Sequence, residues 1–136
     1  MLKDRVFQLI CSVVIAEAVL HQLGISAGFY ATYQWFDLLT HFLGGFIIGG
    51  LGLWILLKTD FRTLFFRKNN VPSAQILFLG FAVAVMVGIG WEIFEALIDP
   101  FLSKEAGYIG DTALDLIADS AGGLLVAFLF FSNRKS

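Results

Sequence analysis

The chain has 136 residues, of which 58% are hydrophobic and only 15% are charged, and its mean hydropathy is +0.82. Soluble domains carry about 25% charged residues, so this composition excludes an ordinary soluble enzyme and indicates an integral membrane protein. The formal net charge of -2 is small, and nothing in the charge pattern indicates a nucleic-acid partner.

Four hydrophobic runs are long enough to cross a hydrocarbon core of roughly 30 Å at about 1.5 Å per residue. They lie at about residues 6–25, 35–57, 74–98 and 111–131. Because the connections between them are short, consecutive helices are expected to run antiparallel. The sequence therefore predicts an all-α fold, in which residues 1–136 form a single domain built as a four-transmembrane-helix antiparallel bundle.

The basic residues predict how this bundle is oriented. Only Lys104 falls on one side of the four-span arrangement, and the other side holds Lys3, Arg5, Lys58, Arg62, Arg67, Lys68, Arg134 and Lys135. Lys and Arg are in excess on the cytoplasmic side of membrane proteins. We therefore expect a multi-pass protein of the cell inner (plasma) membrane, surrounded by lipid, with both termini cytoplasmic.

Ionisable side chains inside the hydrophobic runs or at their ends are the most informative feature of the sequence. The expected topology brings nine of them into the outer half of the bundle: Glu17, His21, Asp37, His41, Glu92, Glu95, Asp111, Asp115 and Asp119. Residues three or four apart share a helix face, so each of the four helices presents a polar stripe to this layer. Ionisable groups within a membrane are costly and usually mark function, and the layer is therefore the expected site.

Seven carboxylates in one layer need a neutralising partner, because each buried ion costs several kcal/mol. The predicted spans contain no Lys or Arg that would supply it, which leaves protons or bound cations. Imidazole among carboxylates favours Zn, Mn or Fe, whereas an all-oxygen subset would favour Ca or Mg. We expect one or two divalent metal ions, with all nine residues as candidate ligands and Glu92 also as a candidate general base.

Structural explanations stay open for part of the layer. His21 is also explained as a hydrogen-bonding group between helices, and Glu17 as its partner one turn away on the same helix. Asp111 is equally well explained as the N-cap of the fourth helix.

Small residues are concentrated in the second and fourth spans, where Gly45 with Gly49 and Gly123 with Ala127 are four residues apart. Close packing of helices is the first explanation of such pairs, and a homo-oligomer formed through these faces is another. The remaining alternative is space beside the polar layer for a substrate or lipid group, left by Gly44, Gly45 and Gly122.

Three segments carry a family resemblance: Asp37-Leu-Leu-Thr-His41-Phe-Leu-Gly-Gly45, Trp91-Glu92-Ile-Phe-Glu95, and Asp111-Thr-Ala-Leu-Asp115-Leu-Ile-Ala-Asp119-Ser-Ala-Gly-Gly123. Over roughly residues 35 to 125 the chain resembles the VanZ-like group and, more closely, the YjdF-like inner-membrane proteins. The resemblance implies the helical membrane fold and a site at Asp37, His41, Glu92, Glu95, Asp115 and Asp119. VanZ-like sequences tend to carry Lys where this chain has Leu38, and Asn where it has Asp119.

Two classes of function are compatible with these features. The first is a metal-dependent hydrolase or transferase that acts on a lipid-linked or envelope substrate at the outer face of the membrane. The second is non-enzymatic: an ion- or proton-binding transporter or sensor, or a bundle stapled by a structural metal. The inner halves of the spans offer few polar side chains, which argues against conduction by a monomer.

Overall fold

The computed structural model describes residues 5–59, 71–98 and 107–132. Within these ranges, four helices are long and apolar enough to cross a membrane: α1 (Arg5–Ala27), α3 (Gln34–Lys58), α5 (Ser73–Ile98) and α6 (Tyr108–Ser132). A single helical turn, α2 (Phe29–Thr32), connects α1 to α3. The predicted all-α, four-span architecture is confirmed, and the helices run up to three residues beyond the predicted bounds.

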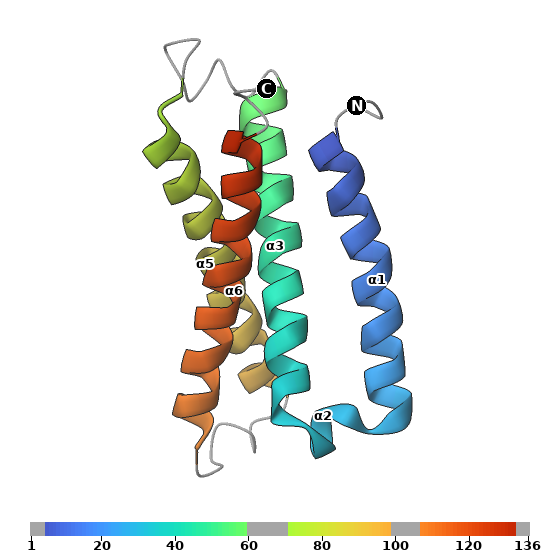
Figure 1. Cartoon of the computed structure of the whole chain (residues 1–136). Helices are drawn as coiled ribbons and strands as arrows, with labels where there is room; N and C mark the ends of the chain where they lie inside the picture. The colour runs from blue at the N-terminus through green and yellow to red at the C-terminus, as the bar shows by residue number, and fades with distance from the viewer. Residues whose placement is uncertain (1–4, 60–70, 99–106, 133–136) are drawn as a thin grey trace.

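Consecutive long helices run antiparallel, so α1 begins and α6 ends at the same end of the bundle (Figure 1). Helices α3, α5 and α6 pack against one another, whereas α1 packs against α3 and α2. In Figure 1 α1 stands to one side of the other three long helices. Only 11% of its most apolar stretch is buried, compared with 39% for α6, so α1 is the peripheral helix of the bundle.

Helices α3 and α6 meet backbone to backbone beside the polar layer. A Cβ atom added to Gly45 would fall on the backbone of Asp119, and one added to Gly122 would fall on the carbonyl of Phe42. Any residue larger than glycine at these two positions forces the helices apart. Close packing therefore explains Gly45 and Gly122, and these two glycines do not widen the space between α3 and α6.

The same type of contact brings α5 against α6. A Cβ on Gly80 would lie 2.7 Å from the Cβ of Ala127, and one on Gly123 would lie 2.7 Å from the carbonyl oxygen of Gly80. On α3, a Cβ on Gly49 would lie 3.0 Å from the Cα of Gly123. The small-residue faces predicted from the sequence are thus filled within the chain, where they bring three helices together.

The half of the bundle that includes the start of α1 has an apolar core. Its largest fully buried side chains are Ile10, Leu53, Ile76 and Val126, one from each long helix. The ionisable residues predicted for the site lie toward the opposite end, where α3 and α6 begin. One half of the bundle is therefore packed with hydrocarbon, and the other half holds the polar groups.

Candidate metal centre

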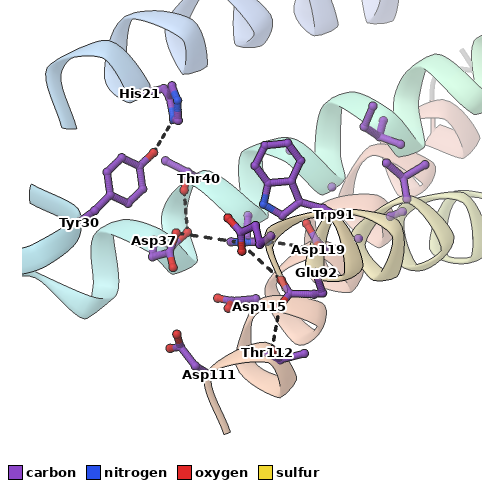
Figure 2. Close-up of a pocket in the computed structure, with 18 of the residues that line it drawn as sticks. His21, Tyr30, Asp37, Thr40, Trp91, Glu92, Asp111, Thr112, Asp115 and Asp119 are labelled. Carbon is purple, nitrogen blue, oxygen red and sulfur yellow. Dashed lines mark hydrogen bonds and ion pairs between the residues drawn. The ribbon is translucent and has the colours of Figure 1, made fainter. Parts of the chain in front are cut away.

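All nine ionisable residues predicted for the site line one cavity of about 640 Å³ in the described part of the chain. Residues from α1, α2, α3, α5 and α6 contribute to its walls, and the close-up in Figure 2 shows ten of the lining side chains labelled. The cavity extends from the ionisable groups to apolar side chains that include Ile48, Ala84 and Val87. The polar residues that the sequence predicts on four helices therefore do line one common cavity.

Within this cavity, one set of side chains is close enough to hold a metal ion. Asp37, His41 and Asp115 each offer one ligand atom, and the three atoms lie within 4.8 Å of one another. We call these residues the triad. Asp37 and His41 are one turn apart on α3, whereas Asp115 approaches from α6 and is only 4% exposed.

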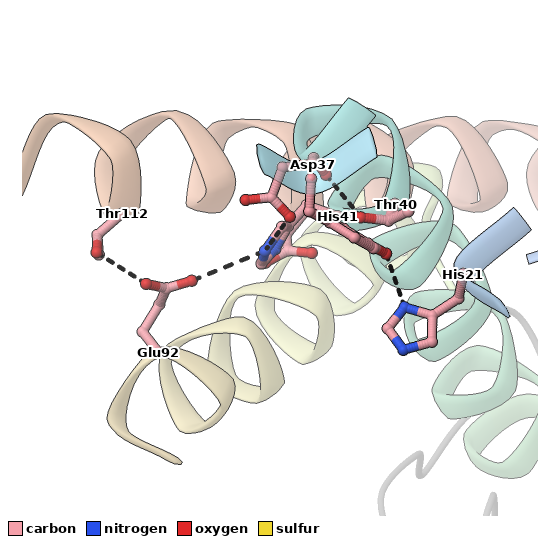
Figure 3. A network of polar contacts seen from close by, with 8 residues as sticks. His21, Asp37, Thr40, His41, Glu92 and Thr112 are labelled. Carbon is pink, nitrogen blue, oxygen red and sulfur yellow. Dashed lines mark hydrogen bonds and ion pairs between the residues drawn. The ribbon is translucent and has the colours of Figure 1, made fainter. Parts of the chain in front are cut away.

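The imidazole of His41 is at the centre of the polar contacts (Figure 3). Its Nε2 atom is 4.0 Å from Oδ1 of Asp37 and 4.0 Å from Oε1 of Glu92. Its Nδ1 atom is 3.4 Å from Oδ2 of Asp119, which accepts a hydrogen bond when Nδ1 carries the proton. A carboxylate on one ring nitrogen fixes the orientation of a histidine and leaves the other nitrogen available as a ligand.

Two carboxylate oxygens at the site are buried without a hydrogen-bond partner among the described residues. They are Oε1 of Glu92 and Oδ1 of Asp115. The other oxygen of Glu92, Oε2, accepts a hydrogen bond of 2.8 Å from the hydroxyl of Thr112. Buried polar atoms are nearly always paired, because leaving one unpaired costs several kcal/mol. These orphaned oxygens therefore indicate that a proton or a cation belongs in the site.

Tyr30 of α2 adds a group that the sequence analysis had not assigned to the site. Its hydroxyl is 2.7 Å from Nδ1 of His21, so Tyr30 is the partner of this histidine where Glu17 had been considered. Burial raises the pKa of the Tyr30 hydroxyl, Thr40 lowers it by hydrogen bonding, and the carboxylates of Asp37, Glu17 and Glu95 raise it further. The phenol is therefore neutral at physiological pH and can donate its proton in a hydrogen bond.

Asp111 occupies the first turn of α6, which begins at Tyr108. The explanation of Asp111 as the N-cap is therefore wrong, and its own N–H donates to the carbonyl of Gly107, at 3.0 Å. Helix α6 starts one turn earlier than predicted because Gly107, with φ of 109°, turns the chain immediately before it. Asp111 is exposed at the rim of the cavity and lies outside the triad.

Sequence reasoning also missed the neutral residues that support the ionisable ones. Thr112 bonds to Glu92, and the hydroxyl of Thr40 donates to the backbone carbonyl of Asp37. Gly88 of α5 leaves the room that the carboxylate of Asp119 occupies, since a Cβ there would fall on that group. A threonine or glycine in an apolar helix gives no such signal in the sequence, because both are common in transmembrane helices.

Comparison with known proteins agrees with a membrane location. A family model described as a predicted membrane protein, DUF2238, matches residues 4–136. The chain belongs to this family. A relative from Thermotoga maritima, named an uncharacterized protein, is 29% identical over 134 residues, covering 96% of this chain and 64% of its own length. The chain therefore spans less than two thirds of the length of that relative. No solved structure matches this chain.

Proposed function

We propose that the protein is a membrane metalloprotein that binds a divalent ion at Asp37, His41 and Asp115. The observation that carries this proposal is the convergence of three ligand atoms within 4.8 Å. The orphaned Oδ1 of Asp115 supports it, because a cation between the helices would give this oxygen a partner.

The donor set favours a transition metal over Ca or Mg. One imidazole and two carboxylates suit Zn, Mn or Fe, whereas the hard cations prefer oxygen ligands alone. Three protein ligands also leave a coordination position open, as is usual in catalytic zinc sites. In this scheme Asp119 is a positioning residue, because it faces Nδ1 of His41 and leaves Nε2 for the metal.

We infer that the centre serves a hydrolase or transferase. A bound divalent ion supplies such a reaction with a more acidic water molecule and a polarised phosphoryl or carbonyl oxygen. Glu92 is suited to accept a proton, because its Oε1 has no hydrogen-bond partner among the described residues and lies 4.0 Å from Nε2 of His41. Thr112, which bonds to the other oxygen of Glu92, orients that carboxylate toward the triad.

The position of the cavity within the bundle supports a lipid-linked or envelope substrate at the outer face. Two of the basic residues that predict the orientation are among the described residues. Arg5 begins α1 and Lys58 ends α3. Both therefore lie at the end of the bundle opposite the cavity, which by the positive-inside rule would be cytoplasmic. We also propose that the chain is related to the VanZ-like and YjdF-like proteins. The motifs around Asp37, Glu92 and Asp115 support this relationship.

A non-enzymatic ion site is the competing function. The buried side chains of Ile10, Leu53, Ile76 and Val126 close the half of the bundle away from the cavity, which disfavours conduction through one chain. A sensor or a structural metal would use the same triad but would not need an unpaired base beside it. The enzyme is therefore preferred on the evidence of Oε1 of Glu92.

Elemental analysis of the purified protein tests the metal centre, with a matched control for His41 and for Asp115. We expect about one divalent ion per chain, lost in His41→Ala and retained in His21→Ala, since His21 bonds to Tyr30 outside the triad. Asp115→Asn should likewise lose the ion, whereas Asp111→Asn, one turn away on α6, should keep it. Metal-free wild-type protein after growth with Zn, Mn and Fe supplied would refute the proposal.

A further inference from the structure

Part of the polar layer stands outside the triad and has no role in the proposed metal centre. Glu17 of α1 and Glu95 of α5 are partly buried carboxylates that line the cavity. Neither belongs to the group of described ligand atoms that lie within 4.8 Å of one another. Ionisable groups within a membrane usually mark function, so Glu17 and Glu95, the latter beside the indole of Trp91, are candidates for a second recognition element.

Glu17, Glu95 and Tyr30 all line the same cavity. Burial raises the pKa of the Tyr30 hydroxyl most, Thr40 opposes this effect, and the charges of Asp37, Glu17 and Glu95 raise the pKa further. Carboxylates from α1, α3 and α5 therefore act on one phenol that lines the same cavity. Because that phenol is neutral and His21 is its hydrogen-bonding partner, it gives the acids no compensating charge.

The charge of the cavity wall selects the sign of a ligand. One divalent ion at the triad would reduce the formal charge of the seven lining carboxylates from -7 to -5. The described Lys and Arg residues, Arg5 and Lys58, lie at the far end of the bundle. An anionic ligand would be repelled by this wall, whereas a ligand with a positive charge would be attracted.

An organic ammonium fits this second element better than a second metal ion does. Among the described residues, the triad is the group tight enough for a metal, and Glu17 and Glu95 are not drawn into another. Aromatic rings of Tyr30, Trp91 and Tyr108 also line the cavity, and aromatic faces attract ammonium groups.

The inner part of the cavity is lined by apolar side chains against which a hydrocarbon chain can pack. Ile48 of α3 follows His41 by two turns on the same face, and on α5 Ala84 and Val87 precede Glu92 by eight and five residues; all three line the cavity. The volume of about 640 Å³ is that of a site for a ligand of several hundred daltons.

We propose that the cavity binds an amine-bearing amphiphile, with its ammonium group between Glu17 and Glu95 and its alkyl chain along Ile48, Ala84 and Val87. This inference rests on the proposed function in one respect, since the same amphiphile would be the substrate presented to the triad. It names the substrate class as cationic or zwitterionic lipid, and it assigns Glu17 and Glu95 to recognition.

Binding of three probes with one chain length tests the inference: dodecylamine, dodecanol and dodecyl phosphate. Each is titrated calorimetrically into the purified protein in an uncharged maltoside detergent, with protein-free micelles as the blank. We expect the amine to bind at least about tenfold more tightly than the alcohol, because a charge-assisted hydrogen bond in a buried site contributes a factor of that order. The phosphate should bind more weakly than the amine.

Isosteric variants then locate the ammonium. Glu17→Gln and Glu95→Gln should each lower the affinity for the amine about tenfold and leave that for the alcohol unchanged, and Glu17→Asp should recover part of the loss. Equal binding of amine and alcohol by the wild type would overturn the inference, and so would an unchanged amine preference in both Gln variants.

Metal content, measured on the same samples, should be the same in all variants. Wild-type protein that lacks metal but prefers the amine would refute the metal centre alone, and metal-loaded protein without the preference would refute this inference alone.

Discussion

Two neighbouring glycines of α3 give the sharpest test of the packing that holds the site. A Cβ on Gly45 would lie 2.6 Å from the carbonyl carbon and the Cα of Asp119, whereas one on Gly44 would meet only Oδ1 of Asp119, at 4.0 Å. Carbon atoms are in favourable contact at about 3.5 to 4.0 Å, so Gly45→Ala must separate α3 from α6 by on the order of 1 Å. Backbone atoms cannot rotate out of the way as a side chain does.

We expect Gly45→Ala to lower the free energy of unfolding by about 3 kcal/mol, the upper end of the usual cost of overpacking. Gly44→Ala should be neutral or stabilising by about 0.5 kcal/mol, because alanine has the better helix propensity and room for its methyl group. Reversible unfolding in mixed micelles, monitored by circular dichroism, measures both. Equal stability of the two variants would refute the packing described for α3 and α6.

Three further predictions concern the site and the topology. Glu92→Gln should retain the metal and the fold but lose activity on a lipid substrate; loss of metal together with the fold would instead indicate a structural staple. Thr112→Val should destabilise the protein by about 1 kcal/mol, since it removes the hydrogen bond to Oε2 of Glu92. Thermal unfolding measures this loss, and Thr32→Val is the control because the hydroxyl of Thr32 bonds to a backbone carbonyl at an exposed position. In a Cys11→Ser background, cysteines at Tyr33 and Lys58 should be labelled from opposite sides of the membrane, and labelling from one side would overturn the four-span topology.

Much of the fold was predictable because hydropathy is a property of consecutive residues. Long apolar runs and short connections are enough to predict four antiparallel helices. How tightly each helix packs is a different matter: α1 and α6 are equally apolar, yet α1 lies at the edge of the bundle and α6 is the most buried. That difference depends on matching surfaces, such as Gly45 against Asp119, which a single helix does not reveal.

The candidate site was predictable as a set of residues but not as a set of contacts. Helical spacing places Asp115 and Asp119 on one face of α6, and the sequence offers no reason to give them different surroundings. The structure places Asp115 in the triad and Asp119 against Nδ1 of His41. This distinction depends on the rotation of α6 against α3, which the glycine contacts determine. Tyr30 was missed for a related reason, since α2 is a single turn without a periodic pattern.

The uneven packing of the four long helices gives the cavity one closely packed wall and one loosely packed wall. Glycine contacts hold α3, α5 and α6 in register, and with them Asp37, His41 and Asp115. Glu17 and His21 are on α1, which has the fewest buried residues. A small tilt of α1 would change the width of the cavity without altering the geometry of the triad, because no triad residue is on α1. The shape of the cavity on the side of α1 and the geometry of the triad are therefore able to change independently in this bundle.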